Sequence, residues 1–194
     1  MRIRRSTARL GLCITGALLG CLASTDAVAE GTTRTTDEMV PLKVGKACPS
    51  FAGWSMDNEP ISLRETIKPA KTIPANAVVI SFFATWCESC KKRLPDIQKV
   101  AREFKDKTVR VLLVDFGEGS DAAKPFLESN HFELPTIMDP FEKIGARLGV
   151  TKKLPRTFVV DGDGYVRTIF AFEGDDFQSV LRREIEAALK PLPK

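Results

Sequence analysis

The feature that most constrains the fold is an apolar run that leads directly into a Cys-x-x-Cys motif. Residues 77–84 read Ala-Val-Val-Ile-Ser-Phe-Phe-Ala, and such a run predicts a strand buried on both faces of a parallel sheet. Apolar residues then recur every three or four positions from Cys87 to about Lys105, which predicts a helix with one core-facing side. The two cysteines of the motif therefore lie where a buried strand ends and a helix begins.

The rest of the chain continues this alternation of strands and helices. The expected elements are a strand at 108–115, a helix at 120–130 capped by Ser120, an extended piece at 134–138, a helix at 140–148 stopped by Gly149, strands at 157–160 and 166–170, and a helix at 176–189 stopped by Pro191. Residues 161–164, Asp-Gly-Asp-Gly, predict a hairpin turn between the last two strands. This order predicts an α/β sheet of parallel strands with an antiparallel pair at one side, in one domain over residues 42–194.

The first 29 residues have the pattern of a secretory signal peptide. Four arginines lie within the first nine residues, and an uncharged apolar stretch follows from Leu10 to Ala23. This stretch is shorter than the roughly 20 apolar residues that span a bilayer, so a signal peptide is favoured over an N-terminal membrane anchor. We therefore expect a bacterial protein that is exported, either free in the periplasm or tethered to a membrane and facing it.

Two processing sites are compatible with this segment. Ala27-Val28-Ala29 offers the small residues that signal peptidase I requires before Glu30. Leu18-Leu19-Gly20-Cys21 resembles a lipobox, in which Cys21 would be lipidated and become the new N-terminus. Both sites remain open, and residues 30–41, which are polar and rich in threonine, are expected to form a flexible leader.

The charge balance gives no sign of a nucleic-acid partner. The full chain has 29 basic and 25 acidic residues, a net charge of +4. Residues 1–29 contain four arginines and one aspartate, so the chain from Glu30 has 25 basic and 24 acidic residues and a net charge of +1. This balance argues against binding to nucleic acid or to an anionic membrane surface, so membrane attachment is expected only through a lipid on Cys21. The short basic clusters at 91–93 and 182–183 are expected to be solvated helix faces.

Cysteine usage favours a redox pair over a disulfide scaffold. Cys13 and Cys21 belong to the signal segment, which leaves Cys48, Cys87 and Cys90 in the exported chain. Three cysteines in a chain of this length are far fewer than in disulfide-rich secreted domains, and a close pair is typical of a working couple. Cys48 is expected to behave as a small buried hydrophobe.

The position of the motif indicates how the pair would react. A thiolate at a helix N-terminus is stabilised by unpaired backbone N–H groups and by the helix dipole, and the thiolate is the attacking species. Cys87 is therefore expected to be the exposed nucleophile. Cys90, one turn inside the helix, is expected to be the less exposed resolving thiol.

Three other uses of the pair compete with redox chemistry. A structural disulfide is disfavoured because closing so short a loop removes little chain entropy. A zinc site would need two more ligands, for which Cys48 and His131 are the other candidates. A copper(I) site needs only two thiolates, so a copper(I) metallochaperone remains the main alternative; the redox interpretation requires no metal and no other cofactor.

The sequence resembles the TlpA/ResA-type branch of the thioredoxin-like superfamily. Three segments carry the resemblance: residues 44–51, residues 83–87 at the approach to the motif, and residues 154–164. The resemblance implies a thioredoxin-like α/β fold with a central mixed sheet flanked by helices and a short N-terminal extension added to the sheet. It also implies an exported protein-disulfide reductase, a type often found near cytochrome c maturation, that receives electrons from a membrane thiol-transfer protein.

The resemblance assigns further residues to the site. It implies a cis peptide bond between Leu154 and Pro155, which would face the cysteine pair and leave backbone groups of Leu154 free to pair with a disulfide-containing protein substrate. Trp86 is expected to shield the sulfurs and to contact the same substrate. A thiol peroxidase is a second alternative, because peroxiredoxins share this superfamily.

Two positions depart from the pattern of the resemblance. Arg93 stands where members of the branch often carry a carboxylate, and Ser81 stands where thioredoxin has a buried acid. A serine hydroxyl does not act as that acid does. The base that activates Cys90 and the direction of the redox reaction therefore remain open at this point.

Overall fold

The computed structural model describes residues 42–69, 74–105, 108–171 and 176–190, which belong to a unit spanning Thr36–Lys194. The predicted signal peptide, the lipidation site Cys21 and the leader at 30–41 lie outside these residues. Within the described ranges, no helix is both long enough and apolar enough to cross a membrane.

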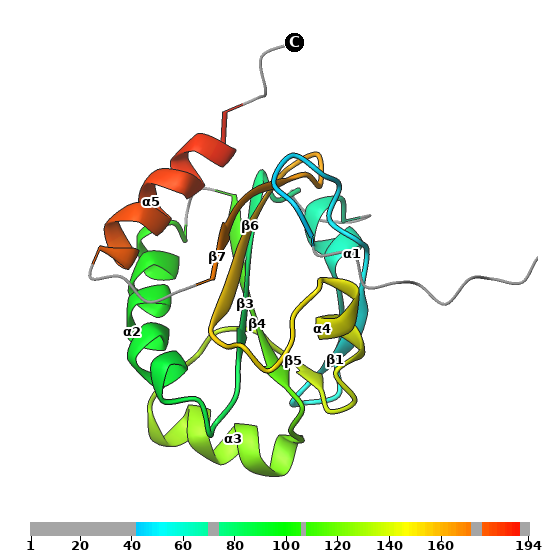
Figure 1. Cartoon of the computed structure of the whole chain (residues 1–194), viewed down its shortest axis with the longest axis vertical. Helices are drawn as coiled ribbons and strands as arrows, with labels where there is room; N and C mark the ends of the chain where they lie inside the picture. Colours follow the sequence, from blue (N-terminus) through cyan, green and yellow to red (C-terminus); the bar gives the residue numbers. More distant parts are fainter. Residues whose placement is uncertain (1–41, 70–73, 106–107, 172–175, 191–194) are drawn as a thin grey trace, which may run out of the picture. The chain divides into compact units, whose positions relative to one another are not determined.

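The described residues form one mixed sheet with helices on both faces (Figure 1). The seven strands follow the order β2-β1-β5-β4-β3-β6-β7. Their bounds are β1 Ala52–Ser55, β2 Pro60–Ser62, β3 Ala77–Phe83, β4 Val109–Phe116, β5 Thr136–Asp139, β6 Arg156–Asp161 and β7 Val166–Phe170. Strands β3, β4 and β5 are parallel, whereas β6 is antiparallel to β3 and β7 is antiparallel to β6. The predicted thioredoxin-like α/β fold with a central mixed sheet is confirmed.

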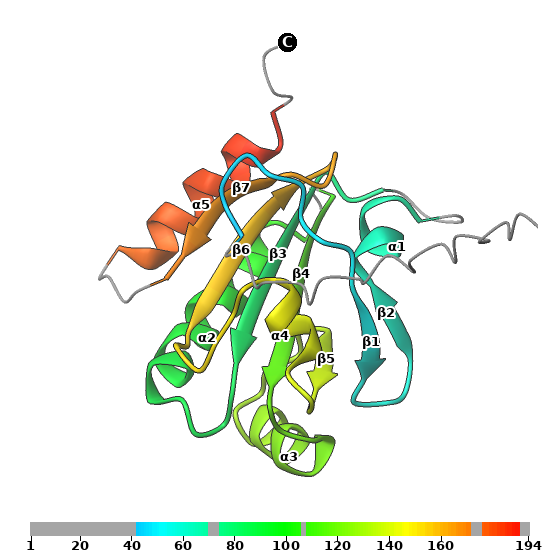
Figure 2. The ribbon, with the colours of Figure 1, turned by 45° about the vertical axis from the view of Figure 1, so that its right-hand side comes forward.

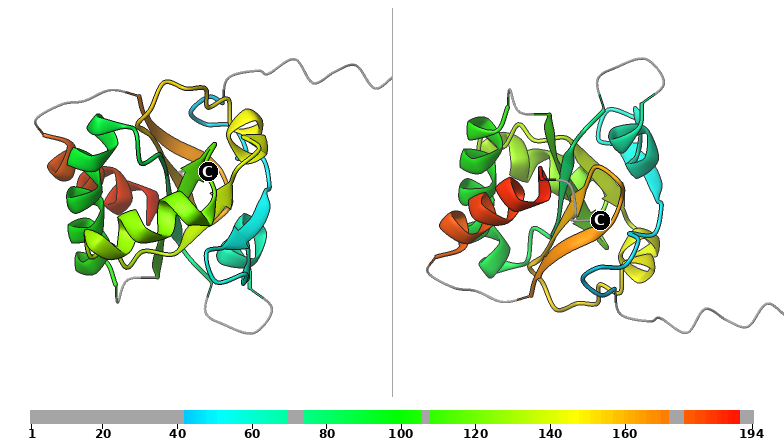
Figure 3. Two further views of the ribbon diagram at one scale, coloured as in Figure 1. Left: turned by 90° about the horizontal axis from the view of Figure 1, so that it is seen from below. Right: turned by 90° about the horizontal axis from the view of Figure 1, so that it is seen from above.

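The central strand β3 separates two apolar core layers. All seven of its residues are buried, and successive side chains point to opposite faces of the sheet. One layer contains Val79 and Phe83 together with residues of α2 (Glu88–Glu103), α3 (Ser120–Ser129) and α5 (Phe177–Ala188). The other layer contains Ile80 and Phe82 together with residues of α1 (Leu63–Ile67) and α4 (Lys143–Arg147). Figure 3 shows these two groups of helices on opposite sides of the sheet.

A hairpin formed by β1 and β2 adds two strands at the β5 edge of the sheet. Trp54 of β1 lies opposite Met138 of β5 in antiparallel register. The short helix α1 follows directly, and its N-cap Ser62 accepts a hydrogen bond from the Glu65 N–H. This hairpin is the N-terminal extension that the family resemblance implied, although the apolar pattern alone located neither strand.

The predicted elements after residue 77 are present, with one wrong detail at α3. The N-cap of α3 is Gly119, so Ser120 is the first helical residue and does not cap the helix. Gly149 follows α4 with a φ of +67°, and the Val150 N–H donates to the Gly145 carbonyl, as expected of a glycine stop. Asp161 holds the predicted hairpin turn by accepting hydrogen bonds from the backbone N–H groups of Asp163 and Tyr165.

One end of the sheet gathers the loops that carry the cysteine motif (Figure 2). The parallel strands β3, β4 and β5 all end there, at Phe83, Phe116 and Asp139. The antiparallel strand β6 begins at the same end, where Arg156 lies opposite Phe82. The carboxyl end of a parallel sheet is where α/β proteins commonly place their functional groups.

Candidate active site

The Cys87–Cys90 pair lies at the junction of β3 and α2 and is oxidised in this structure. The two sulfurs are 2.01 Å apart and the two Cα atoms 5.2 Å apart. Cys87 is the N-cap residue of α2, and the backbone N–H of Cys90 donates to its Sγ at 3.2 Å. The sulfur of Cys87 therefore occupies the place where a helix N-terminus best stabilises negative charge.

Both cysteines are buried, which corrects one expectation about Cys87. Its exposed fraction is 6% and that of Cys90 is 1%. Cys87 is thus the more accessible of the two, but it is not an exposed residue in the disulfide form, because both side chains belong to the core layer beneath α2 and α5. Trp86, immediately before it, is 53% exposed and forms the solvent-facing part of this loop.

The Leu154–Pro155 segment reaches the same end of the sheet as the cysteines. The peptide bond between the two residues is cis, as the family resemblance implied. Pro155 directly precedes β6, whose first residue Arg156 pairs with Phe82 near the end of β3. The topology therefore places Leu154 and Pro155 beside the loop that carries Cys87. Pro155 is buried, and Leu154 is partly buried against both core layers.

Ser81 of β3 is satisfied by a neighbouring hydroxyl. Its side chain lies 2.8 Å from Oγ1 of Thr157, its in-register partner on β6. Both side chains are buried, at 1% exposure each. A hydroxyl pair of this kind satisfies its own hydrogen-bonding needs, so neither residue is the missing base.

Arg93 contradicts the expectation of a solvated basic cluster at 91–93. Its exposed fraction is 7%, and its guanidinium lies 3.9 Å from the centre of the Phe177 ring on α5. A flat guanidinium stacks well on an aromatic face, and its stem packs as an apolar chain. Arg93 therefore joins α2 to α5, while Lys91 on the outer face pairs with the exposed Glu88.

Glu118 fastens the loop that precedes the cysteines, a contact that the sequence did not reveal. One carboxylate oxygen accepts the backbone N–H of Thr85 at 2.5 Å, and the other accepts the Thr85 hydroxyl at 2.6 Å. Thr85 lies two residues before Cys87, and Glu118 follows the end of β4. Charge-assisted bonds such as these are stronger than neutral ones. The Glu118 side chain thus ties the active-site loop to the neighbouring strand.

Asp115 is a second carboxyl group of this region that sequence reasoning missed. It is completely buried, and neither carboxyl oxygen accepts a hydrogen bond from any donor within the described ranges. Burial, followed by the charge of Glu118, raises its pKa to about 8. The available signal was an acid inside an apolar strand, Val114-Asp115-Phe116, but the sequence alone does not say what surrounds it.

Cys48 is less buried than the sequence analysis expected. It is partly buried against the core layer of α1 and α4, and burial raises the pKa of its thiol to about 12. A thiol with so high a pKa supplies almost no thiolate near neutral pH. Within the described residues, no group of three or more His, Cys, Asp or Glu side chains is arranged to hold a metal ion.

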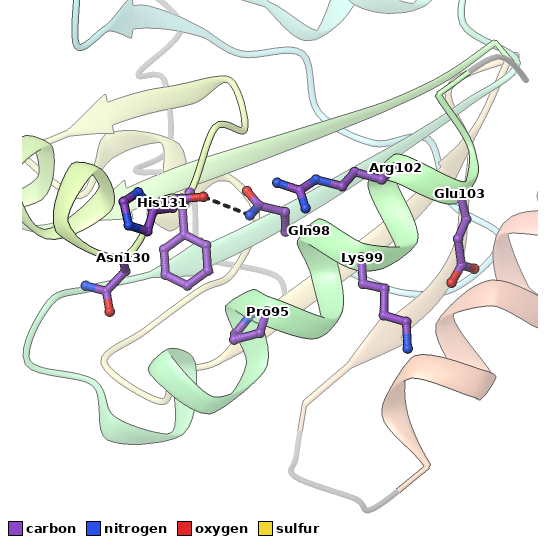
Figure 4. A pocket seen from close by; sticks show the side chains of 8 residues that line it. Pro95, Gln98, Lys99, Arg102, Glu103, Asn130 and His131 are labelled. Atoms are coloured by element: carbon purple, nitrogen blue, oxygen red, sulfur yellow. Dashed lines mark hydrogen bonds between the residues drawn. The ribbon is translucent and has the colours of Figure 1, made fainter.

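A hollow of about 810 Å³ lies on the outer side of α2, away from the cysteines. Figure 4 shows the side chains of Lys99 and Arg102 from the second half of α2 beside it. Gln98 also lines this hollow and binds the backbone of the loop after α3. Its side chain donates to the His131 carbonyl at 2.9 Å and accepts from the Glu133 N–H at 2.8 Å. His131, which the sequence analysis named as a candidate zinc ligand, lies in this loop and adopts a φ of +56°.

Sequence comparisons relate the chain to known thiol-disulfide oxidoreductases. Residues 44–169 match the model of the AhpC/TSA family. The thiol-disulfide oxidoreductase ResA of Bacillus thuringiensis (strain Al Hakam) is 28% identical over 125 residues, which cover 64% of this chain and 68% of the relative. ResA of Bacillus subtilis (strain 168) is 27% identical over 125 residues, covering 64% of this chain and 65% of the relative.

Solved structures show the same fold. A putative thiol:disulfide interchange protein DsbE from Chlorobium tepidum superposes with a TM-score of 0.68 at 23% identity, over 77% of this chain and 99% of that structure. DsbF of Mycobacterium tuberculosis superposes with a TM-score of 0.61 at 21% identity, over 71% of this chain and 94% of that structure.

The fold, the oxidisable cysteine pair and the sequence relatives together define a thiol–disulfide oxidoreductase of the thioredoxin-like, TlpA/ResA type. The family match covers well over half of the chain, and the protein belongs to the AhpC/TSA family.

Proposed function

We propose that the protein is exported and reduces disulfide bonds in partner proteins through Cys87 and Cys90. The observation that carries the proposal is the placement of the Cys87 sulfur at the N-terminus of α2, bonded to the sulfur of Cys90 one turn further on. Export is supported by the signal-like pattern of residues 1–29. Electrons would come from a membrane thiol-transfer protein, as the family resemblance implies.

The reaction proceeds in two exchange steps. The Cys87 thiolate attacks one sulfur of the substrate disulfide, which forms a mixed disulfide and releases the other substrate sulfur as a thiolate. Cys90 then loses its proton, and its thiolate attacks the Cys87 sulfur, which releases the second substrate sulfur. Two electrons have passed to the substrate, whose thiolates take up protons, and the Cys87–Cys90 disulfide remains.

The substrate would dock on the surface around the cysteines. Trp86 offers an exposed aromatic face beside the pair, and burial of such a face is favourable in protein interfaces. The Leu154–Pro155 segment borders the same loop through the pairing of β6 with β3. A substrate strand would therefore lie across Trp86 and Leu154, with its disulfide above Cys87.

Replacement of the resolving cysteine tests this mechanism. In the C90S variant the second step is blocked, so a mixed disulfide between Cys87 and the substrate should accumulate. We expect a covalent adduct with a disulfide-containing substrate protein on non-reducing gels, which disappears on addition of dithiothreitol. The C48S variant is the matched control and should form no trapped adduct, because it retains both active cysteines.

Other outcomes would identify the alternatives. Absence of any adduct with C90S would contradict the proposed mechanism. Tight, stoichiometric copper(I) binding by the reduced pair, without disulfide-reductase activity, would indicate a metallochaperone instead. Rapid consumption of peroxide by C90S, with dependence on Cys87 alone, would indicate a thiol peroxidase.

A further inference from the structure

Asp115 is a buried ionisable group for which the reaction outlined above has no use. Its carboxyl is inaccessible to solvent, and no donor of the described residues bonds to it. Burying an unpaired carboxylate costs free energy, so such a group is neutral over part of the pH range, and it is retained either for packing or for a function. Its place in the fold decides between these two interpretations.

Asp115 lies beside the end of β3, where the active-site loop begins. It is in register with Phe83, the last residue of β3, and Thr85 follows two residues later. Leu113, two residues before it on β4, belongs to the core layer that also holds Cys87 and Cys90. Because side chains alternate along a strand, Asp115 points to that same face of the sheet.

Glu118 connects Asp115 to the loop. It lies three residues after Asp115, just beyond the end of β4, and its charge raises the pKa of Asp115. The same carboxylate binds the backbone N–H and the hydroxyl of Thr85. Two ionised carboxylates have no proton to share and repel each other. One neutral carboxyl beside one carboxylate can form a strong hydrogen bond.

We propose that Asp115 and Glu118 share one proton and position the loop before Cys87, so that ionisation of Asp115 shifts the redox equilibrium of the Cys87–Cys90 pair toward the disulfide. The inference rests on the proposed redox function of that pair. Asp115 acts through Glu118 and Thr85, and it is therefore a positioning residue.

The sign of the effect follows from the charges that face Asp115. Glu118 lies just beyond the end of β4, the strand that carries Asp115. The charges of Glu118 and of Asp139 on β5 both raise the pKa of Asp115. Its in-register neighbours, Phe83 on β3 and Met138 on β5, carry no charge. The buried ionisable groups at the N-terminal half of α2 are Cys87, Cys90 and Arg93. The Arg93 guanidinium stacks on Phe177 of α5, and the two cysteines, which share the core layer of Leu113, bear negative charge only when reduced. A carboxylate on Asp115 therefore disfavours the thiolate and favours the disulfide.

The pH range of the effect is set by burial. The pKa of Asp115 is about 8 in this oxidised structure. Below pH 7 the group is mostly neutral and should leave the couple unaffected. Above pH 8 it is mostly ionised, and the coupling should appear.

The test compares the wild-type protein with D115N across pH. For each protein, the equilibrium constant for reduction by dithiothreitol is measured at pH 6, 7, 8 and 9 from Trp fluorescence. Dithiothreitol titrates equally in both experiments, so its titration cancels when the wild-type constant is divided by the D115N constant. We expect the wild-type constant divided by the D115N constant to be near one at pH 6 and to fall several-fold by pH 9.

Two further variants separate positioning from a general loss of structure. D161N removes another buried carboxylate, held at the opposite end of the sheet by backbone N–H groups, and its ratio to the wild type should stay constant with pH. E118Q removes the nearest negative charge, so the pH at which the effect appears should move to a lower value.

The results distinguish failure of this proposal from failure of the proposed function. A reversible couple in both proteins with a ratio independent of pH would overturn the role of Asp115 and leave the redox function intact. A ratio that rises with pH would also overturn it. Absence of any reversible couple in the wild type would overturn both proposals.

Discussion

At Asp115, desolvation and electrostatic repulsion act in the same direction, and both favour the neutral acid. Burial is the larger cause of its raised pKa, and the charge of Glu118 is the next. Arg93 shows how a charge can be buried differently, because its guanidinium stacks on the Phe177 ring. Burial of a charged side chain therefore has different effects at the two positions. The Arg93 guanidinium has an aromatic partner, whereas the Asp115 carboxyl has no donor among the described residues and is favoured in its neutral form.

The effect of Asp115 on stability should depend on pH. Its pKa rises from an ordinary value of 3.8 to about 8 in the folded protein, so the folded state binds the proton more tightly than the unfolded state. The stability this provides is complete below pH 4 and is lost as the pH rises toward 8, at about 1.4 kcal/mol per pH unit. We expect the unfolding free energy of D115N, measured in urea, to increase relative to the wild type from pH 5 to pH 8.

A constant difference between the two proteins over that range would contradict this prediction. The comparison uses the oxidised form of both proteins, so that the titration of the cysteines does not contribute. An offset that is the same at every pH would report only the packing of the asparagine amide.

At the scale of the element, α4 depends on a close approach to the sheet. The backbone N–H of Gly145 donates to the Asp139 carboxylate at 2.8 Å. A Cβ atom on Gly145 would lie 2.3 Å from the Phe116 ring, and Phe116 is itself buried in the centre of its core layer. This glycine is therefore required by packing, whereas its backbone conformation is an ordinary helical one.

The G145A variant should accordingly be destabilised. The added methyl group has to displace Phe116 or move α4 away from β4 and β5, and overpacking of this kind costs about 1–3 kcal/mol. Thermal unfolding followed by circular dichroism measures the loss. K143A, which places an alanine at an exposed position of the same helix, should change stability by less than about 0.5 kcal/mol. Equal melting temperatures for G145A and the wild type would contradict the packing argument.

Elements with strong burial were predictable from sequence, and elements with mixed burial were not. Strand β3 was recognised because all seven of its residues are buried. Strands β1 and β2 contain only exposed and half-buried residues and include Gly53 and Pro60, so their apolar signal is weak. The cysteine pair was recognisable because its residues lie three apart in the chain. The Asp115, Glu118 and Thr85 group was not, because pairing between β3 and β4 brings it together.

At the scale of the whole molecule, redox chemistry and folding stability are linked by a thermodynamic cycle. A pair that reduces other proteins must be more stable as a disulfide in the folded state than in an unfolded chain. The oxidised protein must then be the more stable form. A strongly oxidising pair shows the opposite order, because folding stabilises its reduced form.

This linkage predicts the order of the two unfolding transitions. If the protein is a reductase, its oxidised form should unfold at a higher denaturant concentration than its dithiothreitol-reduced form. Each increment of about 30 mV in reducing power corresponds to about 1.4 kcal/mol of additional stability in the oxidised form. Guanidinium unfolding of both forms, followed by Trp fluorescence, provides the measurement. A more stable reduced form would instead make the protein a disulfide donor.

The hairpin at the β5 side of the sheet has a consequence for solubility. Without β1 and β2, the parallel strand β5 would present its backbone groups to solvent as a template for another chain. The hairpin pairs with β5 and moves the edge outward to β2, which has three residues and begins with Pro60. A proline lacks the N–H that a neighbouring strand would need. The extension thus ends the sheet in a short strand that is poorly suited to recruit a strand of another chain, which protects the protein from edge-to-edge association.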